Sequence, residues 1–174
     1  MENLLTILVT TYNRSPYIQY LVERLSSYID RGLRFNVLIS DDCSKDDTEH
    51  LCLEYQRKYD WLTYYRLEKN SGMDANFKNA YSHCETKYCW LLGDHRYIDF
   101  DEMKTLLDEL SQEKYDALIL KCREEVVYLD KEYTDINTLF RELGFNITNN
   151  ASCVIPTSFF NEFMYQRFKG TTFL

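Results

Sequence analysis

The sequence alternates short apolar runs with longer segments that have the spacing of amphipathic helices. The first run is short, apolar and β-branched, as in a buried strand, and the third has the alternating character of a strand. These runs cover residues 4–10, 35–40, 62–67 and 88–92, and the helical segments after them end near residues 31, 59, 84 and 111. Four such units in succession predict an α/β fold with a mostly parallel central sheet, flanked by helices that make right-handed crossovers.

The first and fourth helices carry start signals. Ser15 is predicted as the N-cap of the first helix, with Pro16 at its first position and Gly32 after its last turn. Asp99 and Glu102 have the spacing of a capping box before the fourth.

Beyond residue 111 the pattern is looser. It predicts strands at 117–121, 126–129 and 153–155 and helices at 135–143 and 158–168. A length of 174 residues without repeats or linkers fits one domain. The apolar last residues lead us to expect a truncated chain.

Composition limits the class of protein. Hydrophobic residues make up 45% and charged residues 28%, as in folded globular proteins. The net charge of −8, with no cluster of Lys or Arg, disfavours nucleic acid as a partner. An anionic ligand would need a bound cation or a local basic residue. No apolar run is long enough to span a membrane.

Six cysteines are scattered without a C-x-x-C pair, and the first residues lack the features of a signal peptide. We therefore expect reduced thiols and a cytoplasmic location. The glycosylation patterns at Asn146 and Asn150 would then have no role.

Polar residues follow three of the predicted strands. They begin near Thr10, Asp41 and Asp94. In an open parallel sheet, ligands bind beside the carboxyl ends of the strands. Carboxylates in such a place, without a glycine-rich phosphate loop, suggest a diphosphate held through a metal cation.

Asp41 and Asp42 permit two interpretations. Asp is common in turns and helix caps, so the pair can be purely structural. Alternatively, a carboxylate accepts the N3–H of uracil or thymine, and burial of that hydrogen bond would discriminate between bases.

The residues after the first strand also permit two interpretations. Thr10–Arg14 can form a capped turn, or Tyr12 can offer a flat face to a base and Arg14 can donate to a phosphate. The polar segment 70–78, with Gly72, is a helix start in one interpretation. In the other, Asn76 or Lys78 contacts ribose or phosphate.

Asp94, His95 and Arg96 follow the fourth strand. A histidine in such a loop is often only hydrogen-bonded. The functional interpretation gives Asp94 the ribose hydroxyls and makes His95 a ligand of a cation that bridges two phosphates. Arg96 can supply part of that charge.

Three segments together carry a family resemblance. Residues 5–14 (LTILVTTYNR), 38–48 (LISDDCSKDDT) and 90–96 (WLLGDHR) occur in the order seen in family 2 glycosyltransferases of the GT-A fold. The chain resembles the N-terminal, donor-binding part of that family. The resemblance implies a Rossmann-like GT-A domain over 1–174, with a nucleotide-sugar half at 1–100 and the start of an acceptor half at 101–174.

The resemblance also implies roles for individual residues. Thr10 and Tyr12 would contact the base and ribose, Asp42 would accept from the base with Asp41 beside it, and Asp94 would contact the ribose. His95 stands where the family has a metal-binding Asp; a carboxylate suits the expected Mn²⁺ or Mg²⁺, whereas an imidazole favours later transition metals.

The resemblance implies an inverting glycosyltransferase with a UDP-sugar donor. The acceptor would be a saccharide or lipid-linked sugar of bacterial polysaccharide biosynthesis, at the inner face of the membrane. Such enzymes need an Asp or Glu as general base, and the chain has no convincing candidate; Glu162 lies in a helical pattern. An inactive nucleotide-binding module or scaffold is therefore the alternative. A nucleotidyltransferase would need a basic, glycine-rich loop after the first strand, and residues 11–14 do not provide one.

Overall fold

A computed structural model describes residues 3–96, 98–120, 131–147 and 150–160 of the chain. Within these residues a central six-stranded sheet has the order β3-β2-β1-β4-β6-β5. Its strands are β1 (Leu5–Thr11), β2 (Asn36–Asp41), β3 (Leu62–Arg66), β4 (Tyr88–Leu91), β5 (Leu118–Ile119) and β6 (Cys153–Pro156). The pairs among β1 to β4 are parallel, whereas β6 is antiparallel to both of its neighbours. The predicted α/β fold with a mostly parallel sheet is confirmed.

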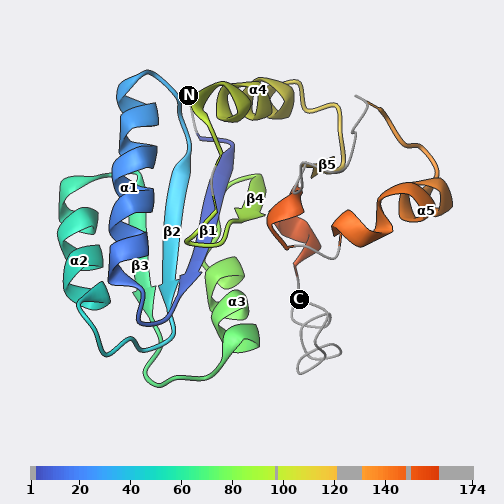
Figure 1. The fold of residues 1–174 in the computed structure, drawn as a ribbon. Helices are drawn as coiled ribbons and strands as arrows, with labels where there is room; N and C mark the ends of the chain where they lie inside the picture. The colour runs from blue at the N-terminus through green and yellow to red at the C-terminus, as the bar shows by residue number, and fades with distance from the viewer. Residues whose placement is uncertain (1–2, 97, 121–130, 148–149, 161–174) are drawn as a thin grey trace.

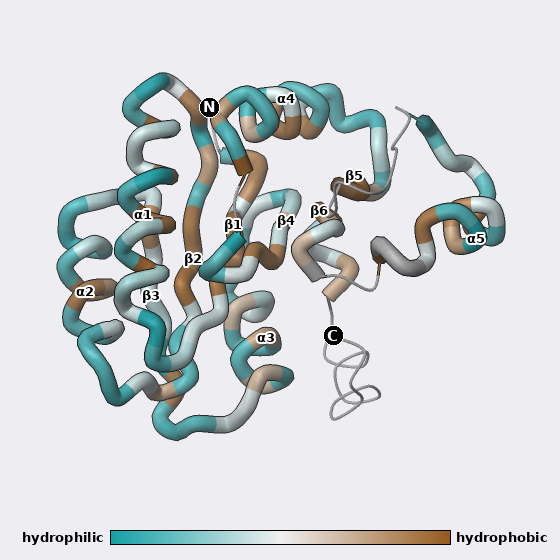
Figure 2. Tube along the Cα trace, in the orientation of Figure 1, coloured by the Kyte–Doolittle hydropathy of each residue, from teal (hydrophilic) through white to brown (hydrophobic). Residues whose placement is uncertain are grey.

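Helices cover both faces of this sheet (Figure 1). They are α1 (Ser15–Asp30), α2 (Thr48–Lys58), α3 (Met73–Ser82) and α4 (Phe100–Ser111), whereas α5 (Ile136–Ile147) lies to the side of the sheet. Alternate residues of β1 explain the layers, because Ile7 and Val9 pack with α1, α2 and α4 while Leu8 packs with α3 on the other face. Figure 2 shows the resulting apolar strands between polar helix surfaces.

Several predicted boundaries change. Arg14, not Ser15, is the N-cap of α1, and its side chain makes no capping hydrogen bond. Asp99 does form the predicted capping box with Glu102. The strand predicted at 117–121 is only two residues long within the described part. The strand predicted at 126–129, and residues 161–168 of the last helix, lie outside the described residues.

Two short 3-10 helices flank β6, at Asn150–Ser152 and Thr157–Phe159. The helix predicted from residue 158 thus begins as a 3-10 turn in the described part. Among the described residues, no helix is both long and apolar enough to cross a membrane.

Candidate functional site

The carboxyl ends of β1, β2 and β4 bring three loops to one edge of the sheet. Thr11 is paired with Asp41 in register, and the next amide, that of Asp42, donates to the carbonyl of Thr11 over 3.0 Å. On the other side of β1, the amide of Leu92 donates to Leu8 over 2.9 Å. The loops that follow β1 and β2 run along the lower end of the sheet in Figure 1.

Asp42 is held by the loop that precedes α3. It is 4% exposed; its Oδ1 accepts from the amide of Ser71 at 2.7 Å, and its Oδ2 accepts from that of Gly72 at 2.9 Å. Gly72 has φ 86° and ψ 170°, a conformation that is open essentially only to glycine. Each carboxylate oxygen keeps a second lone pair, so Asp42 retains acceptor capacity beyond these two amides.

Asp41 is directed into the protein. It is fully buried, its Oδ1 accepts from the amide of Ser44 at 3.0 Å, and its Oδ2 accepts from the Tyr64 hydroxyl at 2.7 Å. Arg66 Nε lies 3.6 Å from the same Oδ2. Burial, and then the Asp41 carboxylate, raise the pKa of Tyr64 well above its usual range. The sequence places Asp41 in the nucleotide site beside Asp42, whereas this geometry gives it the task of holding the β2–α2 loop.

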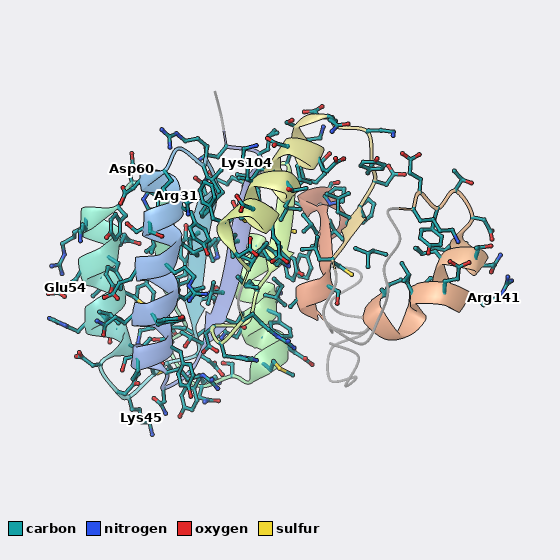
Figure 3. All side chains as sticks on the ribbon, turned by 45° about the horizontal axis from the view of Figure 1, so that its top comes forward. Arg31, Lys45, Glu54, Asp60, Lys104 and Arg141 are labelled. Carbon is teal, nitrogen blue, oxygen red and sulfur yellow. The ribbon has the colours of Figure 1, made fainter. Side chains whose placement is uncertain are left out.

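The β1–α1 and β2–α2 loops are joined to each other. The amide of Asn13 donates to Ser44 Oγ at 2.8 Å, and the amide of Lys45 donates to Asn13 Oδ1 at 2.6 Å. Asn13 and Cys43 adopt positive φ values of 55° and 64°. Such strain in residues other than glycine collects at functional sites. Figure 3 shows Lys45 at the lower edge of the molecule, away from Arg31 and Asp60 at the other end.

Asp46 makes a second connection between these loops. Its Oδ2 accepts from the amide of Ser15 at 3.1 Å, and its Oδ1 accepts from the amide and hydroxyl of Thr48 at 3.1 and 2.6 Å. Burial opposes ionisation of this carboxyl, but the hydrogen bonds from Thr48 and Ser15 outweigh it and lower the pKa of Asp46. The starts of α1 and α2 are thus held together through one carboxylate.

The remaining predicted nucleotide contacts differ in exposure. Asn76 is 4% exposed, and its side chain donates to the Thr11 carbonyl at 3.3 Å and accepts from Ser40 Oγ at 2.5 Å. It therefore ties α3 to the sheet. Thr10 is half-buried, and Tyr12 is exposed, so its ring is open to a ligand. The hydroxyl of Thr11 is buried without a partner among the described residues.

Asp94 and Arg14 meet across the edge between β1 and β4. Arg14 Nε lies 2.8 Å from Oδ2 of Asp94, which is 6% exposed. The two atoms are at ion-pair distance, yet neither completes a hydrogen bond of ordinary geometry. Arg14 also covers the Tyr17 ring at 4.3 Å. The other carboxylate oxygen, Oδ1, lies 3.3 Å from Nδ1 of the exposed His95.

The site offers few ligands to a metal ion. Within the described ranges, no three His, Cys, Asp or Glu side chains gather in a way that could hold one. Asp94 and His95 are the adjacent pair at this edge, and Arg14 occupies one oxygen of Asp94. These residues therefore do not fit a preformed divalent site.

Sequence reasoning missed the partners that orient the two aspartates. Tyr64 and Ser44 satisfy the buried Asp41, and two backbone amides satisfy Asp42. A charged residue at the end of a buried strand needs such partners, so the sequence position of Asp41 and Asp42 indicates that partners exist. Which residues supply them depends on the register of β2 with β3, which no local pattern specifies.

A comparison of the sequence with profiles of known protein families identifies the family of this chain. The sequence profile described as Glycosyl transferase family 2 matches residues 6–168. The chain belongs to glycosyl transferase family 2. The predicted resemblance to that family is confirmed.

Curated glycosyltransferases are similar to this chain over parts of their length. The abequosyltransferase RfbV of Salmonella typhimurium is 29% identical over 59% of this chain, and Poly(ribitol-phosphate) beta-N-acetylglucosaminyltransferase TarS of Staphylococcus aureus is 28% identical over 68%. Dolichyl-phosphate beta-glucosyltransferase of Saccharomyces cerevisiae is 22% identical over 79%. The chain spans 31%, 21% and 43% of these relatives.

Solved glycosyltransferase structures share the fold. The S. aureus TarS structure in complex with UDP has a TM-score of 0.69 at 20% identity, over 97% of this chain and 52% of that one. The mannosyltransferase PcManGT from Pyrobaculum calidifontis, in complex with GDP-Man and Mn2+, has a TM-score of 0.61 at 14% identity, over 98% and 48%. The predicted GT-A fold is therefore confirmed.

Proposed function

We propose that this chain is the donor-binding part of a glycosyltransferase that uses a nucleoside diphosphate sugar. The observation that carries the proposal is the convergence at one sheet edge of the loops after β1, β2 and β4, with Arg14 and Asp94 2.8 Å apart. A ligand placed there would meet carboxylate, guanidinium and aromatic groups together. The relatives support the proposal, since solved neighbours hold UDP, UDP-GlcNAc and GDP-Man.

The proposed donor is a UDP-sugar. Asp42 would accept the N3–H of uracil through a lone pair that Ser71 and Gly72 leave open. Cytosine and adenine lack a donor at the matching position, so they would leave this remaining lone pair of a buried carboxylate unpaired. Tyr12 and Thr10 would contact the base and ribose, and Asp94 the ribose.

The proposed reaction is a single displacement with inversion. An acceptor hydroxyl attacks the anomeric carbon, the bond from that carbon to the diphosphate oxygen breaks, and UDP leaves. The hydroxyl proton passes to a general base, for which the described residues offer no assigned group. Loss of a general base costs about 10²- to 10⁴-fold in rate.

The predicted Mn²⁺ or Mg²⁺ would have Asp94 and His95 as its available ligands. Mg²⁺ often uses only one or two protein groups together with substrate phosphates. Because Arg14 already contacts one oxygen of Asp94, we assign no step of the reaction to the ion.

The proposed acceptor is a saccharide or lipid-linked sugar of polysaccharide biosynthesis, used at the cytoplasmic face of a membrane. Support comes from relatives whose names specify poly(ribitol-phosphate) and dolichyl phosphate. This part of the proposal rests on kinship alone, because fold does not determine the acceptor.

Calorimetric titration with UDP, CDP, ADP and GDP tests the donor assignment. We expect UDP to bind at least about tenfold more tightly than CDP and ADP, whose bases lack the donor, while GDP, whose guanine carries an N1–H, serves as a comparison. Asp42→Asn should remove most of that preference, because an amide can present a donor where the carboxylate only accepts. A matched control is Asp47→Asn, an exposed change in the same loop region. Equal binding of all four nucleotides by the unchanged protein would contradict the assignment.

An inactive nucleotide-binding module is the second candidate. The ion pair between Arg14 and Asp94, and His95 in place of a carboxylate, favour it over a metal-dependent enzyme. Tight UDP binding without hydrolysis or transfer from any UDP-sugar would support the module. Release of UDP from a UDP-sugar would exclude it.

A further inference from the structure

Arg14 is held in place on two sides. Its Nε lies 2.8 Å from Oδ2 of the buried Asp94, and its guanidinium carbon lies 4.3 Å from the centre of the Tyr17 ring. A guanidinium fixed by a carboxylate and an aromatic face has lost most of its conformational freedom before any ligand arrives. It is therefore preorganised for binding.

The outer part of the same guanidinium is open. Nε lies 2.8 Å from Oδ2 of Asp94, and the four N–H groups on the two terminal nitrogens make no hydrogen bond within the part of the chain that the structure describes. The Arg14 side chain is 40% exposed. Two parallel N–H groups match the oxygens of a phosphate, which makes this edge suited to bidentate binding of a diphosphate.

The negative charge of Asp94, the carboxylate that would bind a divalent ion, is already balanced by Arg14. Asp94 is 6% exposed, and a carboxylate at such a depth needs a positive partner. Arg14 supplies that charge, while His95 contributes an imidazole 3.3 Å from the other oxygen. A divalent ion could use both oxygens only after displacing Arg14.

We propose that the Arg14 guanidinium, oriented by Asp94, is the cation that binds the diphosphate of the donor, so that nucleotide binding needs no divalent ion. The proposal rests on the function proposed above and refines it. The Arg14–Asp94 pair has no net charge, so recognition depends on its directed N–H groups, with the exposed Arg96 two residues beyond Asp94 adding positive charge. Asp94 is then a positioning residue for Arg14.

Calorimetric titration of the full chain with UDP, in EDTA and in Mn²⁺, tests this inference. We expect the two dissociation constants to agree within about twofold. Uridine serves as the probe without phosphates. If UDP binds only in Mn²⁺, the inference is overturned while the function proposed above stands. If UDP binds in neither condition, the proposed function itself fails.

Substitutions at Arg14 give a second, independent test. Arg14→Gln should weaken UDP binding about 10- to 100-fold and leave uridine binding unchanged, because only the contact to the phosphates is lost. It should also make UDP binding stronger in Mn²⁺ than in EDTA, since Asp94 is then available to the ion. Arg24→Gln is the matched control, because Arg24 lies in α1, which begins directly after Arg14, and its guanidinium carbon lies 4.5 Å from the centre of the Tyr20 ring.

Thermal unfolding must accompany these titrations, because Arg14→Gln leaves a buried carboxylate without its partner. If that variant does not fold, Arg14→Lys keeps the charge but loses the paired N–H groups. It should bind UDP several-fold more weakly in EDTA. Unchanged UDP affinity in a folded Arg14→Gln or Arg14→Lys variant would overturn the inference.

Discussion

Replacement of Gly72 by alanine tests the backbone conformation of the loop before α3 without removing a side-chain contact. Gly72 has φ 86° and ψ 170°, and a Cβ added there would meet no atom within 4 Å. The whole cost therefore lies in the backbone conformation. Residues held in such regions cost about 1–3 kcal/mol. If the loop relaxes instead, Asp42 loses the amide at 2.9 Å, and an unsatisfied buried acceptor costs a similar 1–3 kcal/mol.

Urea unfolding and UDP titration of Gly72→Ala should give different results from those of a matched control. Gly32 also has a positive φ, 105°, with no atom within 4 Å of an added Cβ, but it lies at the end of α1 beyond the site. Both variants should lose about 1–3 kcal/mol of unfolding free energy. Only Gly72→Ala should also weaken UDP and uridine binding, by about five- to tenfold. Equal nucleotide affinities in the two variants would refute the idea that the loop orients Asp42.

Three further predictions concern the groups around the site. Tyr64→Phe removes the hydroxyl that donates to the buried Asp41 and should lower the unfolding free energy in urea by about 1–3 kcal/mol; a loss below about 0.5 kcal/mol would show that Asp41 does not need it. The lowered pKa of Asp46 implies a stabilisation that is present above its ordinary value of 3.8 and is lost as the pH falls below it. Asp46→Asn should thus be less stable than the parent near neutral pH, and the difference in unfolding free energy should shrink as the pH falls below 3.8; a pH-independent difference would argue against the carboxylate. A hydrogen bond from the Cys89 thiol, opposed by burial, lowers the pKa of Cys84 to about 5, so its alkylation by iodoacetamide, followed by mass spectrometry, should level off above about pH 6; a rate that rises up to about pH 9 would contradict this.

The sequence predicts the first hundred residues well because local and global signals agree there. Residues 4–10 and 35–40 are apolar and β-branched, and the structure has β1 and β2 within one residue of these limits. The start of α1 shifts by one residue because the loops after β1 and β2 are tied together. Asp46 accepts from the Ser15 amide, so capping comes from a residue that is distant in sequence.

In the candidate site, the sequence predicts the position of the residues but not their hydrogen-bond partners. Position at a strand end places Arg14, Asp42 and Asp94 at one edge, but it does not reveal their partners. Asp41 and Asp42 are adjacent and identical in chemistry, yet one is turned inward to Tyr64 and the other is held by amides of a loop some thirty residues away. Side chains of neighbouring strand residues point to opposite sides, so only the fold distinguishes them.

The Arg14–Asp94 contact likewise depends on the strand order. β4 lies next to β1 although two strand–helix units separate them in sequence. A local motif at residues 93–96 suggests a metal ligand, whereas the fold brings a guanidinium to the same carboxylate. The assignment of charge in the site therefore requires the tertiary structure.

The central claim is that the loops after β1, β2 and β4 form one site for a nucleoside diphosphate. Amide chemical shifts of the isotope-labelled protein, followed during titration with UDP, test it most directly. The account predicts that the largest changes occur together at residues 11–14, 42–44, 71–76 and 93–96, with one common dissociation constant. Changes confined to α2 and α4, or different dissociation constants for the separate loops, would contradict it.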